Sequence, residues 1–234
     1  MFPPVCPVCE RTMPAAHAGR LCEKCKDKVK TVTNNCLKCG RPLNDSDTAL
    51  CAECKNNTFP FKKGFITFLY EGSIRDMLLK FKYKDRRDLG LFFSNASTDM
   101  FGDELKSLAP DAIIPIPVHK KRLRQRGYNQ AEVFGEYVAC ELGIPCAADI
   151  LIRTKETTVQ KSLDVHARLL NLLDAFAVDT DELAAFEKKN GPVKRAVLVD
   201  DIFTTGSTLC ACSLVLRDAG IDEIYVLCVA SPGM

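Results

Sequence analysis

The chain has no apolar stretch long enough to cross a membrane. A span needs about 18 apolar residues, whereas the longest apolar runs, near residues 112–118 and 224–231, have the length of a strand. The chain also lacks a charged N-terminal region followed by an apolar one, which is the pattern of a secretory signal. We therefore expect a cytoplasmic protein. In that reducing compartment, closely spaced cysteines favour metal binding over disulfides.

The composition excludes disordered, collagenous and coiled-coil classes. The 234 residues are 47% hydrophobic and 26% charged, which is typical of a globular chain. At about 150 residues per domain the length predicts one and a half domains. The net charge of +2 hides an asymmetry. Residues 1–130 carry 23 Lys and Arg against 14 Asp and Glu, while residues 131–234 carry 9 against 16, so the front of the chain is basic.

Eight of the 13 cysteines lie in the first 54 residues, in four Cys-x-x-Cys pairs. They are Cys6, Cys9, Cys22, Cys25, Cys36, Cys39, Cys51 and Cys54. Two four-cysteine zinc sites explain this spacing, because a two-residue spacer lets one turn present two sulfurs to a tetrahedral ion. Such closed sites leave no position for water, so we expect both zinc ions to be structural. A disulfide framework is disfavoured by the missing secretory signal.

The pairing of the four cysteine pairs has two alternatives. Sequential ribbons would join the first pair to the second and the third to the fourth, whereas a cross-brace would interleave them. The sequence Cys-Pro-Val-Cys-Glu-Arg at residues 6–11 is repeated as Cys-Leu-Lys-Cys-Gly-Arg at residues 36–41, which favours sequential pairing. We place this zinc-dependent domain at residues 1–58 and a second domain at residues 59–234.

The second domain alternates short apolar runs with helical patterns. Strands are expected over residues 65–70, 112–116, 196–199 and 224–229, and helices over residues 74–81, after residue 88, and over 129–142, 163–173 and 207–219. This alternation predicts an α/β fold, a parallel sheet with helices on both faces. The five later cysteines are expected to be small core residues. They are Cys140, Cys146, Cys210, Cys212 and Cys228.

The most informative segment runs from Ala196 to Leu209. A buried strand ends in Asp200 and Asp201, a small turn follows, and a helix begins. The turn amides, the helix N-terminus and the hydroxyls suit a phosphate dianion, and the carboxylates suit sugar hydroxyls and Mg²⁺. An ordinary strand, turn and helix is the disfavoured alternative. We call residues 204–208 the phosphate loop: Thr204, Thr205, Gly206, Ser207 and Thr208.

A basic loop is expected after the strand at residues 112–116. It carries Lys120, Lys121, Arg122, Arg124 and Arg126 and continues as Arg-Gly-Tyr-Asn-Gln to Gln130. These residues suit a pyrophosphate leaving group or, with the nearby Tyr128, single-stranded nucleic acid. The sequence does not decide between the two. A solvated run of charge is the plainer alternative.

Residues 197–209 resemble the phosphoribosyl pyrophosphate (PRPP) motif of type I phosphoribosyltransferases. By that resemblance Asp200 and Asp201 bind the ribose hydroxyls with Mg²⁺ nearby and act in catalysis, and the phosphate loop binds the 5′-phosphate. Purine-base members often have an aspartate at the position of Thr204. The threonine here argues against purine salvage.

Taken with the four cysteine pairs, Tyr70-Glu71-Gly72, Lys82-Tyr83, Arg-Gly-Tyr-Asn-Gln and the segment from Arg153 to Leu163, this motif resembles the ComF family. The resemblance implies a double zinc ribbon before a phosphoribosyltransferase-like domain, a part in DNA uptake during natural transformation, and single-stranded DNA and other uptake proteins as partners. Phosphoribosyltransferases often carry a mobile loop in the region of Thr154, Lys155, Thr157 and Gln160. A plain polar connection is the alternative there.

Three functions follow and stay open at this point. The chain could transfer a phosphoribosyl group from PRPP to an unidentified acceptor, handle single-stranded DNA, or sense PRPP without turnover. The first two are compatible with each other. The acceptor and the oligomeric state do not follow from the sequence.

Overall fold

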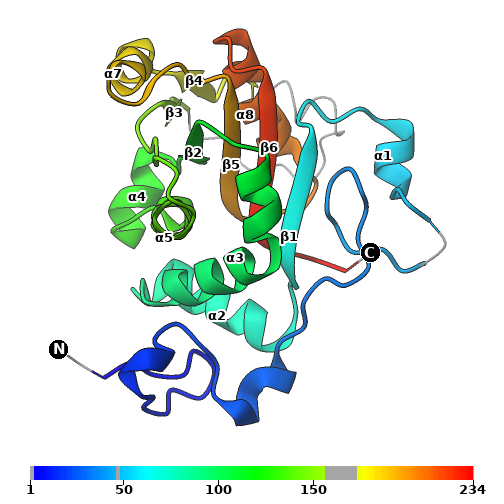
Figure 1. Cartoon of the computed structure of the whole chain (residues 1–234), viewed down its shortest axis with the longest axis vertical. Coiled ribbons are helices and arrows are strands. Elements are labelled where there is room, and N and C mark those ends of the chain that lie inside the picture. Colours follow the sequence, from blue (N-terminus) through cyan, green and yellow to red (C-terminus); the bar gives the residue numbers. More distant parts are fainter. Residues whose placement is uncertain (1–2, 46–47, 156–172, 234) are drawn as a thin grey trace.

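A four-stranded parallel sheet forms the centre of the molecule (Figure 1). The computed structural model describes residues 3–45, 48–155 and 173–233. In spatial order the strands are β1 (Lys63–Leu69), β6 (Glu223–Ser231), β5 (Arg195–Ile202) and β2 (Ala112–Pro115). All three pairings are parallel, with Phe65 opposite Leu227 and Val197 opposite Ile113. The predicted parallel sheet is confirmed, and the carboxyl ends of its strands share one edge.

Three helices cover one face of the sheet: α2 (Gly72–Tyr83), α3 (Leu89–Ser107) and α5 (Gln130–Leu142). In α2 the apolar side chains recur at helical spacing, and Ile74, Met77, Leu78 and Phe81 are all buried, as their spacing predicts. They pack with Phe65 and Phe68 of β1 and with alternate residues of the other strands. This layer is an ordinary helix-on-sheet core.

The opposite face is covered differently. Helix α8 (Ser207–Asp218) packs on it, and that core cluster also takes in residues of the cysteine-rich region and of the segments around residues 147–151 and 175–176. Cys36, Cys39 and Cys51 are buried in the same cluster as Ile66, Leu198 and Val226 of the sheet. Phe59 and Phe61, which follow the last cysteine pair, are buried there as well. The second half of the cysteine-rich region is therefore part of the core.

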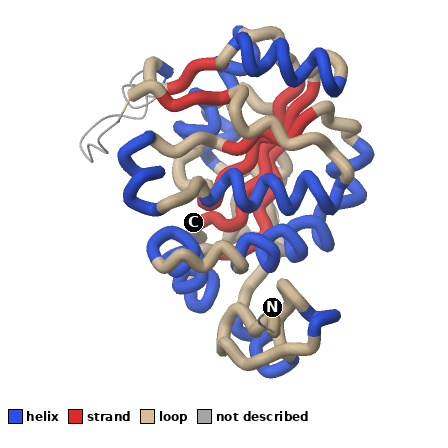
Figure 2. Tube along the Cα trace, turned by 90° about the vertical axis from the view of Figure 1, so that its left-hand side faces the viewer, coloured by secondary structure: helices blue, strands red, loops and turns tan. Residues whose placement is uncertain are grey.

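The first half of that region lies apart from the sheet. We call residues 3–29 the first ribbon and residues 34–56 the second ribbon. In Figure 1 the first ribbon, in dark blue, lies below α2 at one end of the molecule, and the second ribbon lies beside β1. Figure 2 shows the N-terminal part at that same end. The segment between them pairs with β1, since Val32 N–H donates to Thr67 O at 2.9 Å and Leu69 N–H to Lys30 O at 2.9 Å. This pairing covers the outer edge of β1.

Several smaller elements are not predicted by the sequence. Strands β3 (Leu151–Arg153) and β4 (Phe176–Val178) form an antiparallel pair. Short helices are η1 (Ala15–His17), η2 (Glu23–Lys28), α1 (Ala52–Asn56), α4 (Lys120–Arg126) and α7 (Thr180–Asn190). The helix predicted over residues 163–173 lies, up to residue 172, outside the described residues.

The five later cysteines divide between core and surface. Cys210, Cys212 and Cys228 are buried, as predicted. Cys146 is only partly buried and Cys140 is exposed, so the prediction of a core residue is wrong for Cys140. Cys140 lies near the end of α5, on the side of that helix turned away from the sheet.

Candidate functional site: two cysteine clusters and a phosphate loop

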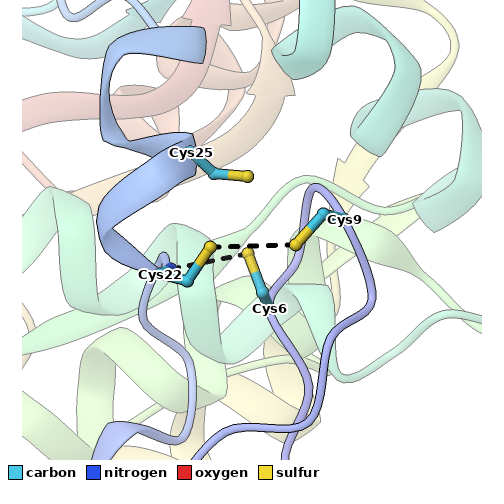
Figure 3. A group of neighbouring side chains, drawn as sticks. All are labelled: Cys6, Cys9, Cys22 and Cys25. Atoms are coloured by element: carbon cyan, nitrogen blue, oxygen red, sulfur yellow. Dashed lines mark hydrogen bonds between the residues drawn. The ribbon is translucent and has the colours of Figure 1, made fainter.

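The eight early cysteines gather in chain order into two clusters. Cys6, Cys9, Cys22 and Cys25 form one, and Cys36, Cys39, Cys51 and Cys54 form the other, and within each cluster the sulfurs lie within 4.8 Å of one another. Figure 3 shows the four side chains of the first cluster converging from a loop and from η2. The grouping is the sequential one that the repeat favours.

The sulfur positions fit zinc. Four Zn–S bonds of about 2.3 Å in a tetrahedron place sulfurs about 3.8 Å apart, and the Sγ–Sγ distances of Cys9–Cys22 and Cys39–Cys51 are both 3.7 Å. Burial raises the thiol pKa, but at Cys6 and Cys36 backbone N–H donors outweigh it and lower the pKa below the ordinary thiol value. Burial and the neighbouring thiols raise the pKa values of Cys22, Cys25 and Cys54. The thiolate is the form that binds the metal. These two clusters are structural zinc sites.

The phosphate loop lies at the carboxyl end of β5, where the sheet meets α8. Gly206 precedes the first residue of α8 and adopts a left-handed φ of +79°. The Thr205 hydroxyl lies 2.9 Å from the Ser207 hydroxyl and accepts from the Ser207 N–H at 3.4 Å. The first N–H groups of a helix have no acceptor within it. Amides and hydroxyls are thus brought together at one turn.

Asp200 and Asp201 lie just before this loop, near the carboxyl end of β5. Burial raises the pKa of Asp200 to about 7, with the Asp201 carboxylate as the second cause, while Lys82 and Arg153 oppose the shift. The Asp200 carboxylate also accepts the Asp201 N–H at 2.8 Å. Two acidic groups therefore stand close together at the edge where ligands of open α/β sheets bind.

Lys82 forms an ion pair with one of these two carboxylates. It lies near the end of α2, and its Nζ is 2.9 Å from Asp201 Oδ2, with both side chains mostly buried. The sequence places Lys82 in a family signature but gives it no role. Spacing cannot reveal such a contact, because 119 residues separate the two partners and only the sheet topology brings α2 beside the end of β5.

The predicted basic loop is a helix. Residues 120–126 form α4, whose last turn ends at Gly127 with a φ of +81°. Lys120, Lys121 and Arg124 are exposed, and Arg122 and Arg126 are partly buried. Arg126 donates to Gln130 Oε1 at 2.9 Å and lies over the ring of Tyr83 at 5.1 Å. The loop prediction fails because the run carries no helix breaker before Gly127.

Gln130, predicted to contact a ligand, is 1% exposed in this structure. Its amide oxygen accepts from Arg126 at 2.9 Å and its Nε2 donates to Phe81 O at 3.4 Å. The side chain thus ties α5 to the end of α2 and orients Arg126. Direct contact of Gln130 with a ligand stays a prediction.

The segment expected to form a mobile loop is only partly described. Thr154 N–H donates to Ala175 O at 2.9 Å, extending the β3–β4 pairing, and Lys155 lies 3.6 Å from Asp174. Thr157 and Gln160 lie outside the described residues. The mobile loop stays a prediction.

Comparisons with known proteins show the family. Residues 1–60 match the double zinc ribbon domain. Competence protein F of Haemophilus influenzae is 32% identical over 225 residues, which is 94% of each chain. The chain belongs to the ComF family. Other ComF relatives are DNA utilization protein YhgH of Escherichia coli K12, at 24% identity covering 97% of this chain and 96% of that protein, and competence protein ComFC of Bacillus subtilis, at 25% covering 86% and 79%.

A solved structure of adenine phosphoribosyltransferase from Leishmania tarentolae matches with 14% identity and a TM-score of 0.33, covering 72% of this chain and 91% of that one. In the part of the ComF chain that the structure describes, no helix is long and apolar enough to cross a membrane.

Proposed function

We propose that this protein binds PRPP with Mg²⁺ at the carboxyl end of β5 and transfers its phosphoribosyl group in a reaction linked to natural transformation. The supporting observation is the adjacent carboxylates of Asp200 and Asp201 immediately before a hydroxyl-rich turn that opens α8. The phosphate loop supplies amides and hydroxyls to the 5′-phosphate, and the carboxylates accept from the ribose hydroxyls. The names of the relatives, competence and DNA utilization proteins, support the biological link.

In the proposed reaction the bond from ribose C1 to the pyrophosphate oxygen breaks and a bond from C1 to the acceptor forms. Pyrophosphate leaves with the electron pair, and Mg²⁺ would offset its negative charge. The two carboxylates fit a hydrated Mg²⁺ because carboxylate oxygens are ligands it accepts. The Lys82 Nζ lies 2.9 Å from Asp201 Oδ2 and stabilises the Asp201 carboxylate until ligand binds.

A calorimetric titration with PRPP and Mg²⁺ tests the binding. We expect saturable binding by the unaltered chain and none by Asp200→Asn, with two zinc ions per chain in both. Pyrophosphate release over a panel of amine and pyrimidine acceptors then separates an enzyme from a PRPP sensor, which would bind without release. Equal affinity of Asp200→Asn for PRPP would contradict the assigned role.

A second function, contact with single-stranded DNA in the cytoplasm, is supported by α4. Its five cations lie on a largely exposed helix. Tyr83, whose ring lies beside Arg126, is 58% exposed and offers a surface for base stacking. Binding should weaken steeply with salt. Replacing Lys120, Lys121 and Arg124 by Glu should remove DNA binding, with the zinc content and Tm of the variant as controls for its fold. Undiminished binding by that variant would count against α4.

A further inference from the structure

Arg41 of the second ribbon joins a zinc ligand to the phosphate loop. Its guanidinium pairs with the Glu53 carboxylate, lies 3.5 Å from Cys51 Sγ, and donates to Thr204 O at 3.4 Å. The same group lies over the ring of Phe203, 5.4 Å from the ring centre. The Arg41 side chain is only 10% exposed. One buried cation therefore spans from a zinc site to the backbone of the loop.

An aromatic cluster of Phe59, Phe61 and Phe203 lies beneath the same loop. Phe59 and Phe61 are stacked at 5.0 Å, and both meet the Phe203 ring edge-on, at 6.2 and 6.4 Å. A Cβ on Gly206 would lie 2.9 Å from the Phe203 ring and 3.0 Å from the Phe59 ring. The loop backbone is thus packed directly on residues that follow the second ribbon, and only a glycine fits at Gly206.

The internal repeat shows that a zinc knuckle does not need this arginine. Arg11 occupies the matching position of the first ribbon. The backbone bonds are the same, since Cys6 N–H donates to Arg11 O and Cys36 N–H to Arg41 O, each at 2.8 Å. The Arg11 side chain, however, is exposed. The burial of Arg41 is therefore explained by what it contacts outside the knuckle.

We propose that the second ribbon is part of the ligand site, with Arg41 as a positioning residue that orients the phosphate loop. In a trans peptide the carbonyl and the following N–H point in opposite directions, and the described residues contain no cis peptide. Anchoring Thr204 O to Arg41 turns the Thr205 N–H away from the ribbon. This inference rests on the proposed phosphate binding for its ligand, but the anchoring can be measured without one.

The test compares Arg41→Met with Arg11→Met in the full, zinc-loaded chain. Without ligand, we expect amide hydrogen exchange at residues 204–208 to rise about tenfold in Arg41→Met, the effect of losing a charged hydrogen bond, while β5 and β6 amides are unchanged. The affinity for PRPP with Mg²⁺ should fall about tenfold for the same reason. Arg11→Met should change neither quantity, and both variants should hold two zinc ions.

Unchanged exchange at residues 204–208 in Arg41→Met overturns the positioning role, whatever binds there. If exchange at residues 204–208 rises in Arg41→Met but the unaltered chain binds no PRPP, the positioning role of Arg41 stands and PRPP is rejected as the ligand. Arg41→Met leaves the Glu53 carboxylate without its partner, which itself destabilises. The double variant Arg41→Met/Glu53→Gln removes that charge. If Arg41→Met loses zinc, hydrogen exchange is measured instead in Arg41→Met/Glu53→Gln, which should keep both zinc ions. Unchanged exchange at residues 204–208 in that variant overturns the positioning role.

Discussion

The first ribbon meets the rest of the molecule through partly exposed side chains, whereas the second lies within the core on the face of the sheet opposite α2 and α3. Glu10 in the first ribbon forms ion pairs of 2.9 Å with Lys80 and Arg86. At the matching position of the second, Gly40 lies against the Gly64 backbone at the start of β1. Two copies of one zinc-binding pattern thus serve different ends. The first covers α2 from outside, and the second supports the sheet and the loop that follows β5.

Replacing one zinc ligand in each ribbon, in two separate variants, tests this difference and has the largest expected effect on stability. Cys51 is 2% exposed within the core cluster, so Cys51→Ser should lose one zinc ion and destabilise the whole chain. We expect a loss of at least about 4 kcal/mol, or roughly 10 °C in Tm. The matched Cys22→Ser should also lose one zinc ion but lower the Tm of the main transition by less than about 3 °C.

Metal analysis measures the zinc content of each variant, and calorimetric melting measures its Tm. Equal losses of Tm in the two variants would show that the two ribbons contribute equally to stability. A second, low-temperature transition in Cys22→Ser would show that the first ribbon unfolds alone, as a ribbon outside the core can.

The contact of the second knuckle with β1 gives an intermediate effect. Gly40 has a φ of +74°, and a Cβ there would collide with the Gly64 carbonyl. Gly64 N–H also donates to Lys38 O at 2.9 Å, so neither backbone can move freely. Gly40→Ala should cost about 2 kcal/mol. Glu10→Ala, which removes only exposed ion pairs, should cost less than about 1 kcal/mol. Denaturant unfolding of both variants measures the difference, and a mild Gly40→Ala would mean that the knuckle is not tightly docked.

Local patterns in the sequence predict the elements that have local causes. The spacing of Ile74, Met77, Leu78 and Phe81 predicts α2, because burial of one helical face leaves that trace. The repeat of Cys-x-x-Cys predicts the zinc clusters, since one turn must present two sulfurs. The strand and glycine-containing turn around Asp200 predict where the phosphate loop lies on the sheet.

Contacts between distant segments leave no such trace. Arg41 and Thr204 are 163 residues apart, and no sequence pattern around Arg41 predicts that contact. The pairing of Lys82 with Asp201 depends in the same way on the strand order β1-β6-β5-β2. The only local signal of the second ribbon's docking is Gly40 in place of Glu10, a residue small enough for backbone to approach backbone.

The smallest expected effect on stability comes from Asp200, in the candidate PRPP site, with both ribbons left intact. Burial and Asp201 raise the pKa of Asp200 to about 7 in the folded chain, far above its ordinary value. A carboxyl group with a raised folded-state pKa favours the folded state at low pH, and this contribution is lost progressively as the pH rises from the unfolded-state pKa of about 4 to the folded-state pKa of about 7. Between pH 6 and pH 8 the unaltered chain should lose about 1 kcal/mol of stability from this group.

Asp200→Asn cannot ionise, so its stability should not show that loss. The difference in Tm between Asp200→Asn and the unaltered chain should therefore grow from pH 6 to pH 8 by about 2–4 °C. Other titrating groups, including the three histidines, are common to both chains and cancel in the difference. Cys22→Ser should follow the unaltered chain across this range, because its ribbon lies outside the core. A constant difference would mean that Lys82 and Arg153, which oppose the shift, keep Asp200 ionised throughout and that the free site already has the charge its ligand requires.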